Sequence, residues 1–265
     1  MRAMLERLQE VLRDTSRPAV ALSGGVDSMT LAVVAGRLDG LDALMCHAVS
    51  PAVPPAATER VRRYAAHEGW RLEVLDAGEF DDARYRANPA DRCFFCKTNL
   101  YGTLAARTGR LLLSGTNLDD LGDWRPGLKA AENHGVRHPY VEAGIDKAGV
   151  RAIARGLGLD DLAELPAAPC LSSRIETGIR IEAADLGAID RVETLLRGEL
   201  GAVTVRCRRR ARGFVVELDE AVLAGLDDAR RSALQAQVER VLAAGRPVAF
   251  LPYRRGSAFL RGAPA

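Results

Sequence analysis

Three things are scarce in this 265-residue chain: long hydrophobic runs, net charge and lysine. No apolar run is long enough to span a bilayer, which argues against a membrane protein. The first residues have the spacing of an amphipathic helix rather than of a secretory signal, so we expect a cytoplasmic protein. The net charge of +2 provides no global field toward nucleic acid, so we expect no nucleic-acid partner.

The small number of lysines and the odd number of cysteines both bear on function. Only three of the 37 basic residues are lysine, namely Lys97, Lys129 and Lys147. A chain that uses arginine for almost every positive charge keeps lysine where a compact, mobile ammonium is useful. Lys97 and Lys129 both lie in motifs described below. The five cysteines are an odd number in a chain without an export signal, which favours free thiols, catalysis or metal binding over a disulfide framework.

The first half of the chain alternates between apolar runs and helical spacing. The runs at 19–22, 43–49, 72–75 and 111–114 predict strands. Helical spacing occurs around and between them, at 2–13, 27–38, 57–68 and 96–106. This alternation predicts an α/β fold with a doubly wound parallel sheet, in which ligands bind at the carboxyl ends of the strands.

The pattern changes after about residue 145 and predicts a second, smaller α+β domain. Its expected elements are helices at 147–157 and 183–198, strands at Val203–Arg208 and Gly213–Asp219, a helix at 227–244 and a strand at Val248–Leu251. The proline-stiffened stretch Leu165–Cys170 is expected to be a hinge or a site loop. We therefore expect a nucleotide-binding domain at 1–145, a connecting segment at 146–182 and the small domain at 183–265.

The segment Ser23–Ser28 follows the first predicted strand, has the sequence Ser-Gly-Gly-Val-Asp-Ser and opens a helix. Small residues at a helix N-terminus expose N–H groups at the positive end of the helix dipole, and glycines allow a phosphate to approach them. The loop is neither a Walker loop nor the Gly-x-Gly-x-x-Gly of dinucleotide folds. The alternative is an ordinary glycine turn with an N-cap serine. The order strand, turn and helix favours a phosphate site.

A Cys-x-x-Cys pair, Cys93 and Cys96, lies in the segment Asn88–Lys97, where a loop runs into a predicted helix. At a helix start both sulfurs point to one side and the helix dipole favours thiolate, as metal ligation or nucleophilic attack requires. The pair alone does not distinguish zinc, an iron–sulfur centre or a redox role. A tetrahedral metal site needs further ligands.

A third cysteine, Cys170, lies in the polar loop Pro169–Arg174. The guanidinium of Arg174 favours a thiolate there, so Cys170 is predicted to be functional. Cys46 lies in an apolar run and Cys207 on a predicted strand. Both are predicted to be structural.

Polar residues follow the last strand of the first domain, in the segments Ser114–Asp120 and Asp123–Ala131. Their position puts them at the carboxyl edge of the sheet, facing the Ser23–Ser28 loop across the crevice. Carboxylates there can carry Mg²⁺, and Arg125 and Lys129 can neutralise phosphate or an anionic acceptor. The alternative is a turn whose aspartates only complement a helix dipole.

In the small domain, Arg206 and Arg208 share one face of a predicted strand. Two guanidinium groups side by side fit a nucleotide-phosphate site. The alternative is a solvated edge strand that is guarded by charge.

Together these motifs resemble one family closely, the ATP-dependent sacrificial sulfur transferases of the LarE family, which have the PP-loop of the ATP pyrophosphatases. The matching segments, spread over nearly the whole chain, are 23–28, 88–97, 115–131, 169–174 and 253–257. The resemblance implies an adenine nucleotide α-hydrolase-like first domain. It also implies that ATP and Mg²⁺ are used to adenylate a carboxylate of pyridinium-3,5-biscarboxylic acid mononucleotide, which sulfur then converts to a thiocarboxylate. The product belongs to the biosynthesis of the nickel-pincer nucleotide cofactor of lactate racemase.

With this resemblance each candidate residue receives an expected role. Binding of ATP and pyrophosphate is expected of Ser23, Gly24, Gly25, Asp27, Ser28, Gly115, Thr116 and Asn117, with Asp27 helping to place Mg²⁺. Binding of the small nucleotide substrate is expected of Asp123, Arg125, Lys129, Arg174, Arg206 and Arg208. The expected catalytic residues are Asp27, Lys97 and Cys170.

Members of the family differ in the source of the sulfur. In some, one cysteine at the position of Cys170 is consumed and becomes dehydroalanine. In others, three cysteines hold a 4Fe-4S cluster that carries an extra sulfide on the iron that they leave open. This chain has all three, Cys93, Cys96 and Cys170, and so resembles the cluster type. The family also assembles through its smaller domain, so a homo-oligomer is expected.

Three other interpretations remain open. A PP-loop tRNA thiolase would use the same loop and cysteines, but it needs many phosphate contacts, and this chain has no extended basic appendage. A PP-loop synthetase could hold structural zinc on Cys93, Cys96 and Cys170. A nucleotide-binding regulator with an inert loop would leave these cysteines unexplained.

Overall fold

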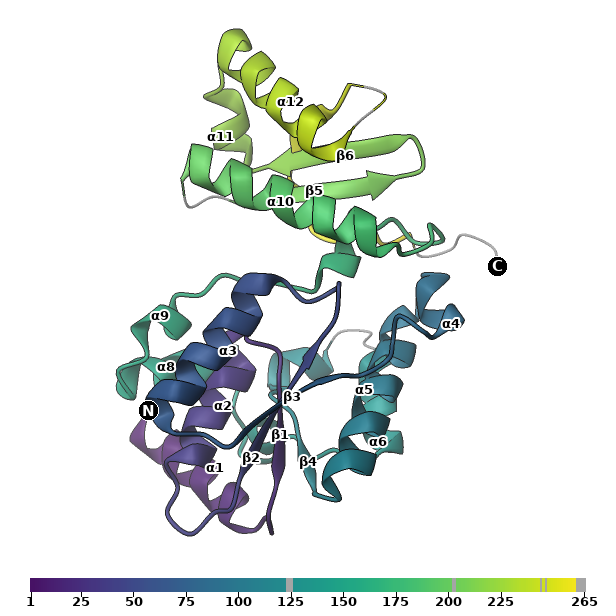
Figure 1. Ribbon diagram of the computed structural model, residues 1–265. Coiled ribbons are helices and arrows are strands. Elements are labelled where there is room, and N and C mark those ends of the chain that lie inside the picture. The colour runs from purple at the N-terminus through teal and green to yellow at the C-terminus, as the bar shows by residue number, and fades with distance from the viewer. Residues whose placement is uncertain (123–125, 202–203, 244, 246, 261–265) are drawn as a thin grey trace. The chain divides into compact units, whose positions relative to one another are not determined.

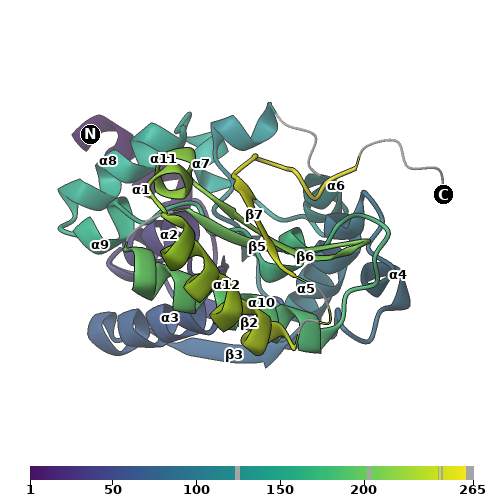
Figure 2. The same cartoon turned by 90° about the horizontal axis from the view of Figure 1, so that it is seen from above.

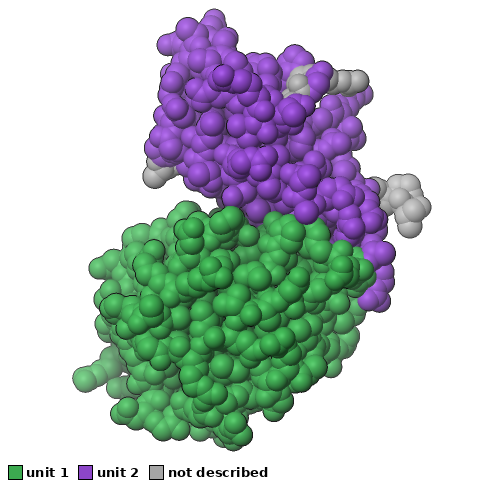
Figure 3. Space-filling view, in the orientation of Figure 1, with its two compact units in different colours: residues 1–82, 93–168 green, residues 83–92, 169–265 purple. Residues whose placement is uncertain are grey.

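The structure is a computed structural model that describes residues 1–122, 126–201, 204–243, 245 and 247–260. It divides into two compact units (Figure 3). Unit 1 comprises Met1–Asp82 with Cys93–Ala168, and unit 2 comprises Ala83–Arg92 with Pro169–Ala265. The chain therefore leaves unit 1 for ten residues, returns at Cys93, and crosses again after Ala168.

Unit 1 is built on a parallel sheet. The strands β1 (Ala19–Leu22), β2 (Leu44–Val49), β3 (Leu72–Asp76) and β4 (Leu112–Leu113) pair in the order β3-β2-β1-β4 (Figure 1). From β1 the chain winds outward to β2 and β3, then crosses back to the other side of β1. The winding direction thus changes between β1 and β4, where open α/β sheets bind their ligands. The predicted doubly wound α/β fold is confirmed.

Helices cover both faces of this sheet (Figure 1). One face carries α1 (Arg2–Arg13), α2 (Val26–Gly36), α3 (Pro55–Glu68), α8 (Lys147–Gly156) and α9 (Asp160–Ala163). The other carries α5 (Arg92–Thr108) and α6 (Pro126–Asn133). Helix α2 is apolar almost all round because it packs between β1, α1 and α8. In the part of the chain that the structure describes, no helix is both long and apolar enough to cross a membrane.

Unit 2 contains a smaller mixed sheet. Its strands β5 (Val205–Arg210), β6 (Gly213–Leu218) and β7 (Ala249–Pro252) lie in the order β5-β6-β7, antiparallel and then parallel (Figure 2). Helix α10 (Ala183–Leu200) packs on β5, and α12 (Asp228–Leu242) packs on α10. The short α11 (Glu220–Ala224) follows β6. The predicted small α+β fold is therefore present, although Val203, the predicted first residue of β5, lies outside the described residues.

The short elements of the chain were not predicted. They are α4 (Ala83–Arg86), α7 (Pro139–Glu142), α9, α11 and the 3-10 turns η1 (Leu118–Leu121) and η2 (Leu171–Arg174). None is long enough to show a helical period in the sequence. Helix α5 is also longer than predicted, because it begins at Arg92 rather than at residue 96.

The excursion Ala83–Arg92 is fastened within unit 2 by buried polar groups. Asn88 is fully buried with a left-handed backbone (φ +56°), and its Nδ2 donates to the carbonyls of Glu176 (2.8 Å) and Ile179 (3.0 Å). The hydroxyls of Tyr85 and Ser172 are 2.6 Å apart. Residues 83–92 therefore belong with residues 172–181, although nearly ninety residues separate them.

Candidate active site

The loop between β1 and α2 keeps the N-terminus of α2 uncovered. Gly24 has a left-handed backbone (φ +77°), and a Cβ there would lie 2.8 Å from the Ala57 carbonyl oxygen, so only glycine fits. The Ser23 N–H donates to the Ser28 hydroxyl (3.1 Å), which closes the turn. Gly25 is the N-cap of α2 and has no side chain to fill the space before the first N–H groups of the helix.

The loop after β4 lies against the same place. A Cβ on Gly115 would lie 2.7 Å from the Ser28 nitrogen, so the two loops touch. The buried Asn117 caps η1, because its Oδ1 accepts from the Asp119 N–H (3.1 Å). Its Nδ2 donates to Oδ1 of Asp27 (3.1 Å). The Ser23–Ser28 loop and the segment Ser114–Asp120, which were predicted to face each other at the carboxyl edge of the sheet, therefore meet in unit 1.

Lys147, which belongs to none of the motifs, also contacts Asp27. Its Nζ donates to Oδ2 of Asp27 (2.5 Å), so each carboxylate oxygen has a partner. The backbone N–H of Lys147 donates to Asp119 Oδ2 (3.3 Å), which ties the start of α8 to η1. The Tyr140 hydroxyl donates to the Asp27 carbonyl (3.0 Å). Lys147 was not predicted as a site residue, and the scarcity of lysine was its only signal in the sequence.

A buried histidine braces the end of β1. His47 Nδ1 donates to the Leu22 carbonyl (2.9 Å), and its Nε2 lies 2.9 Å from the Thr58 hydroxyl, from which it accepts when the ring is neutral. Burial lowers the pKa of His47, in agreement with that form. On the same helix as Thr58, the Arg60 guanidinium donates to the Gly24 carbonyl (2.8 Å). Helix α3 thus fixes the loop from outside, which no local pattern had indicated.

A second histidine lies after β4. The Ser114 hydroxyl is 2.7 Å from His138 Nδ1 and 3.0 Å from the Thr116 hydroxyl. Burial lowers the pKa of His138, although the charges of Glu142 and Asp120 oppose the shift. These contacts hold Ser114 and Thr116, the two residues that flank Gly115, in a hydrogen-bonded turn.

The groups around Asp27 have complementary chemistry. The N-terminus of the eleven-residue α2 provides N–H donors for an anion, and Lys147 adds an ammonium. Asp27 adds a carboxylate of the kind that Mg²⁺ takes from proteins. The combination suits a polyphosphate that carries a divalent ion, at the carboxyl ends of β1 and β4.

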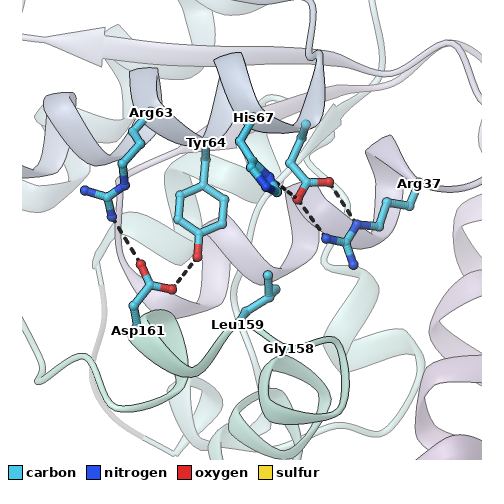
Figure 4. Close-up of a pocket in the computed structure, with 8 residues that line it drawn as sticks. Arg37, Arg63, Tyr64, His67, Gly158, Leu159 and Asp161 are labelled. Atoms are coloured by element: carbon cyan, nitrogen blue, oxygen red, sulfur yellow. Dashed lines mark hydrogen bonds and ion pairs between the residues drawn. The ribbon is translucent and has the colours of Figure 1, made fainter.

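A cavity of about 280 Å³ lies elsewhere in unit 1, between the C-terminal ends of α2 and α3 and residues 158–161 (Figure 4). The Tyr64 hydroxyl and the Arg63 guanidinium point to Asp161, and Arg37 forms two hydrogen bonds with Glu68 (2.8 and 2.7 Å). Helix α2 is about 16 Å long and separates this cavity from the Ser23–Ser28 loop. Its charged groups already satisfy one another, so we assign it no ligand.

Cys93 and Cys96 lie at the start of α5, one turn apart and on the same helical face. Both are half-buried. The Nζ of Lys97 lies 5.6 Å from the centre of the Tyr101 ring, and a Cβ on Gly127 of α6 would lie 3.0 Å from Lys97 Cγ. The close approach of α6 therefore limits where Lys97 can lie.

The five cysteines differ in their exposure. Cys170 is exposed in unit 2, directly before η2. Cys46 and Cys207 are buried. Burial raises the pKa of the Cys46 thiol to about 12, and it also raises the pKa of the Cys207 thiol. These two thiols are therefore neutral and structural. Among the described residues, no three His, Cys, Asp or Glu side chains form a group that could hold a metal ion.

Two of the predicted substrate-binding arginines are buried in ion pairs. Arg174 donates to Glu193 (2.9 and 3.0 Å), and Arg208 donates to Glu217 (3.0 Å). Arg206 is half-buried, 5.9 Å from the Tyr253 ring centre, and burial and the charge of Arg174 lower its pKa. The alternation of side chains along β5 predicted that Arg206 and Arg208 share one face of the strand. It did not predict that Arg208 would be buried in an ion pair with Glu217.

The remaining predicted substrate residues lie in or near α6. Lys129 is exposed and pairs with Glu132 one turn on (2.9 Å). Asp123 and Arg125 lie outside the described residues.

Comparison with known proteins gives three relatives. The chain is 38% identical over 222 residues to an uncharacterized protein of Synechocystis, covering 82% of each chain. It is 27% identical over 205 residues to an uncharacterized protein of Methanocaldococcus jannaschii, covering 76% of this chain and 77% of that one. It is 31% identical over 222 residues to the pyridinium-3,5-bisthiocarboxylic acid mononucleotide synthase of Lactiplantibacillus plantarum, covering 81% and 79%. No family model matches the chain.

Proposed function

Because the chain belongs to the LarE family of sulfur transferases, we propose that it is an ATP-dependent enzyme that converts a carboxylate of a pyridinium dicarboxylate mononucleotide into a thiocarboxylate. The observation that carries the proposal is the meeting of the Ser23–Ser28 loop, Asn117 and Lys147 at Asp27. The Lactiplantibacillus relative is a pyridinium-3,5-bisthiocarboxylic acid mononucleotide synthase, which supports this class of substrate.

The first step is adenylation of the substrate. A carboxylate oxygen attacks the α-phosphorus of ATP, the bond from that phosphorus to the bridging oxygen breaks, and pyrophosphate leaves with the electron pair. The acyl adenylate is a far better electrophile than the carboxylate. The N–H groups at the start of α2, and Mg²⁺ carried with Asp27, would offset the charge that grows on the leaving group. Gly24 and Gly115 let their loops pack closely against Ala57 and Ser28, which holds the start of α2 in place.

The second step is the transfer of sulfur. A sulfur nucleophile attacks the carbonyl carbon of the adenylate, a C–S bond forms, and AMP leaves with the electrons of the C–O bond. We assign the reacting thiol to Cys170, because it is exposed in a polar segment, whereas Cys46 and Cys207 are buried and neutral. Where this thiol attacks, the product is a thioester, and the thiocarboxylate leaves it by elimination: the Cα proton of Cys170 passes to a base, the Cβ–Sγ bond breaks with its electrons going to sulfur, and dehydroalanine remains at position 170. The Lys97 ammonium, next to Cys96, is assigned to balance negative charge during the reaction.

The described side chains contain no ready group of three metal ligands, so the proposal of a 4Fe-4S cluster rests on the thiolate donors that such a cluster takes from proteins. Cys93 and Cys96 present two sulfurs from one helical face, and Cys170 offers a third, exposed one. When bound by three thiolates, such a cluster keeps one iron free of protein ligands and supplies sulfur there.

The substrate anion is assigned to the arginines of unit 2. Arg206 is half-buried and stays the best candidate for a direct phosphate contact. Arg174 and Arg208 also lie in unit 2, but the positive charge of each is neutralised by its glutamate. A small nucleotide needs only such a local site, which agrees with the net charge of +2.

Pyrophosphate release and product mass test this function. Wild-type protein with ATP, Mg²⁺ and pyridinium-3,5-biscarboxylic acid mononucleotide should release pyrophosphate and form a thiocarboxylate seen by mass spectrometry. Cys170→Ala should still release pyrophosphate but form no thiocarboxylate, while Cys46→Ala, which removes a buried thiol, should form both products. Full sulfur transfer by Cys170→Ala would refute its role, and no pyrophosphate release by the wild type would refute the function.

Iron content tests the cluster separately. Anaerobically reconstituted wild type should be brown and contain iron and sulfide, and alanine at Cys93, Cys96 or Cys170 should remove most of both. A colourless protein with stoichiometric zinc contradicts the cluster and favours a structural metal. A mass loss of one H₂S at Cys170 after turnover would show instead that the cysteine itself is consumed.

A further inference from the structure

Lys147 occupies an unusual position for a lysine. It is the first residue of the ten-residue α8, where the helix dipole disfavours a positive charge. The helix is already capped, because the Asp146 side chain accepts from the Gly149 N–H (2.7 Å). The stability of α8 therefore gives no reason for a lysine at this position.

The contacts of Lys147 instead direct it to the Asp27 carboxylate. Its Nζ donates to Oδ2, while Asn117 occupies Oδ1 and the Tyr140 hydroxyl holds the Asp27 carbonyl. The backbone N–H of Lys147 is bound to Asp119, so the start of α8 is fixed to the same wall of the site. An ammonium has three N–H donors, and the contact with Asp27 uses one of them.

The surroundings leave this ammonium accessible to a ligand. The side chains of Lys147 and Asp27 are 33% and 26% exposed, so water reaches the pair. Asp27 is the second residue of α2, so its carboxylate lies at the helix end where the N-cap Gly25 has no side chain to cap the first N–H groups. The ammonium is thus fixed beside the N-terminus of α2, where backbone N–H groups favour an anion.

We propose that Lys147 binds the β- and γ-phosphates of ATP and stabilises the pyrophosphate as it leaves. The inference rests on the proposed function and adds a residue to its first step. When the bond from the α-phosphorus to the bridging oxygen breaks, that oxygen gains negative charge, and the Lys147 ammonium donates a hydrogen bond to the departing group without giving up its proton. Asp27 keeps the ammonium aimed at the phosphates rather than toward solvent.

Pyrophosphate and AMP as separate probes test this role. Calorimetric titration at fixed Mg²⁺ and ionic strength should show that Lys147→Gln weakens binding of inorganic pyrophosphate and of ATP about tenfold or more, as expected for a lost charge-assisted hydrogen bond. AMP has no β- or γ-phosphate, so its affinity should change less than about threefold. Lys147→Arg, which keeps the charge, should recover part of the lost affinity.

The matched control is Arg155→Gln, which removes one positive charge from the last turn of the same helix, where Arg155 pairs with Glu164 in solvent. It should leave all three affinities unchanged. Unaltered pyrophosphate binding by Lys147→Gln, or an equal loss for AMP, overturns the proposal, because Lys147 would then be a spectator or only shape the loop. In either case a wild type that binds ATP keeps the proposed function intact. A wild type that binds neither ATP nor pyrophosphate overturns both.

Discussion

The two units use their charged side chains in opposite ways. At the loop site of unit 1, Asp27 and Lys147 are 26% and 33% exposed. In unit 2, Glu193 and Arg174 are 1% and 3% exposed. A pair that water reaches is worth little and exchanges partners readily, whereas a buried pair cannot lose one member without stranding the other. The comparison separates charges that are available to a ligand from charges that hold the fold.

Glu193 shows how much structure one buried carboxylate can organise. It accepts from Arg174 of η2, from Arg197 of its own helix (2.6 Å) and from the Cys207 N–H of β5 (3.1 Å). Burial alone would raise the pKa of Glu193, but the hydrogen bonds and charge of Arg174 outweigh it, and the pKa is lowered. The carboxylate therefore links α10, β5 and the segment that follows Cys170.

The largest expected effect is loss of this buried carboxylate. Glu193→Ala should lower the free energy of unfolding by about 3–5 kcal/mol, because the buried Arg174 guanidinium would lose the carboxylate that neutralises its charge. Urea unfolding followed by circular dichroism measures it. The control is Glu199→Ala, which breaks an exposed pair with Arg230 and should cost less than about 1 kcal/mol. Equal losses for the two variants would erase the contrast between buried and exposed charges.

A smaller effect is expected from closing the loop site of unit 1. In Gly115→Ala the new Cβ would press on the Ser28 nitrogen, so the two loops must separate, at about 1–3 kcal/mol of stability. ATP binding should weaken more than tenfold, since the phosphate donors lose their spacing. Gly198→Ala is the matched control: its Cβ meets nothing within 4 Å in α10, and it should stabilise by up to about 1 kcal/mol. Unchanged ATP affinity in Gly115→Ala would contradict the close approach.

The smallest expected effect is a pH dependence of stability that arises, among the histidines, in unit 1 alone. All four histidines, His47, His67, His134 and His138, belong to unit 1. Burial lowers the pKa of His47 and of His138, so below about pH 6.5 the unfolded chain binds more protons than the folded one. The stability that they contribute is complete above that pH and is lost as the pH falls toward their folded values.

Tryptophan fluorescence checks this prediction, because Trp70 lies in unit 1. The unfolding temperature of the wild type should fall between pH 7.5 and 5.5, and His47→Gln, which removes one of the two titrating rings, should reduce that fall. His67→Gln is the control, since His67 is exposed. The same pH dependence in His47→Gln and in the wild type would show that His47 is not the titrating group.

Local patterns were enough for most of the fold. Helix α1 has its predicted bounds, and the strands of both sheets lie within a few residues of their predicted ranges, because period and turn residues are local properties. The loop Ser23–Ser28 was recognisable for the same reason. Long-range contacts were not: Lys147 lies 120 residues from Asp27, and no spacing in the sequence relates the two.

Burial was equally hard to foresee from the sequence. Arg208 was expected to face a ligand, yet it is 4% exposed and paired with Glu217 on the neighbouring strand. Alternation assigns a residue to a face of a strand, but only the packing of other elements decides whether that face is covered. Asn88 and Tyr85 were likewise not recognised as the anchors of the excursion Ala83–Arg92.

That excursion also sets an order of events during synthesis. Asn88 is made 88 residues before Glu176, which is roughly 4 to 18 seconds at ordinary elongation rates. During that interval Asn88 and Tyr85 are already part of the chain, but their partners in residues 172–179 have not yet been translated. A single cut after Ala168 would leave the same residues in the wrong fragment. The two units are distinct in space, yet the ribosome cannot deliver them one after the other.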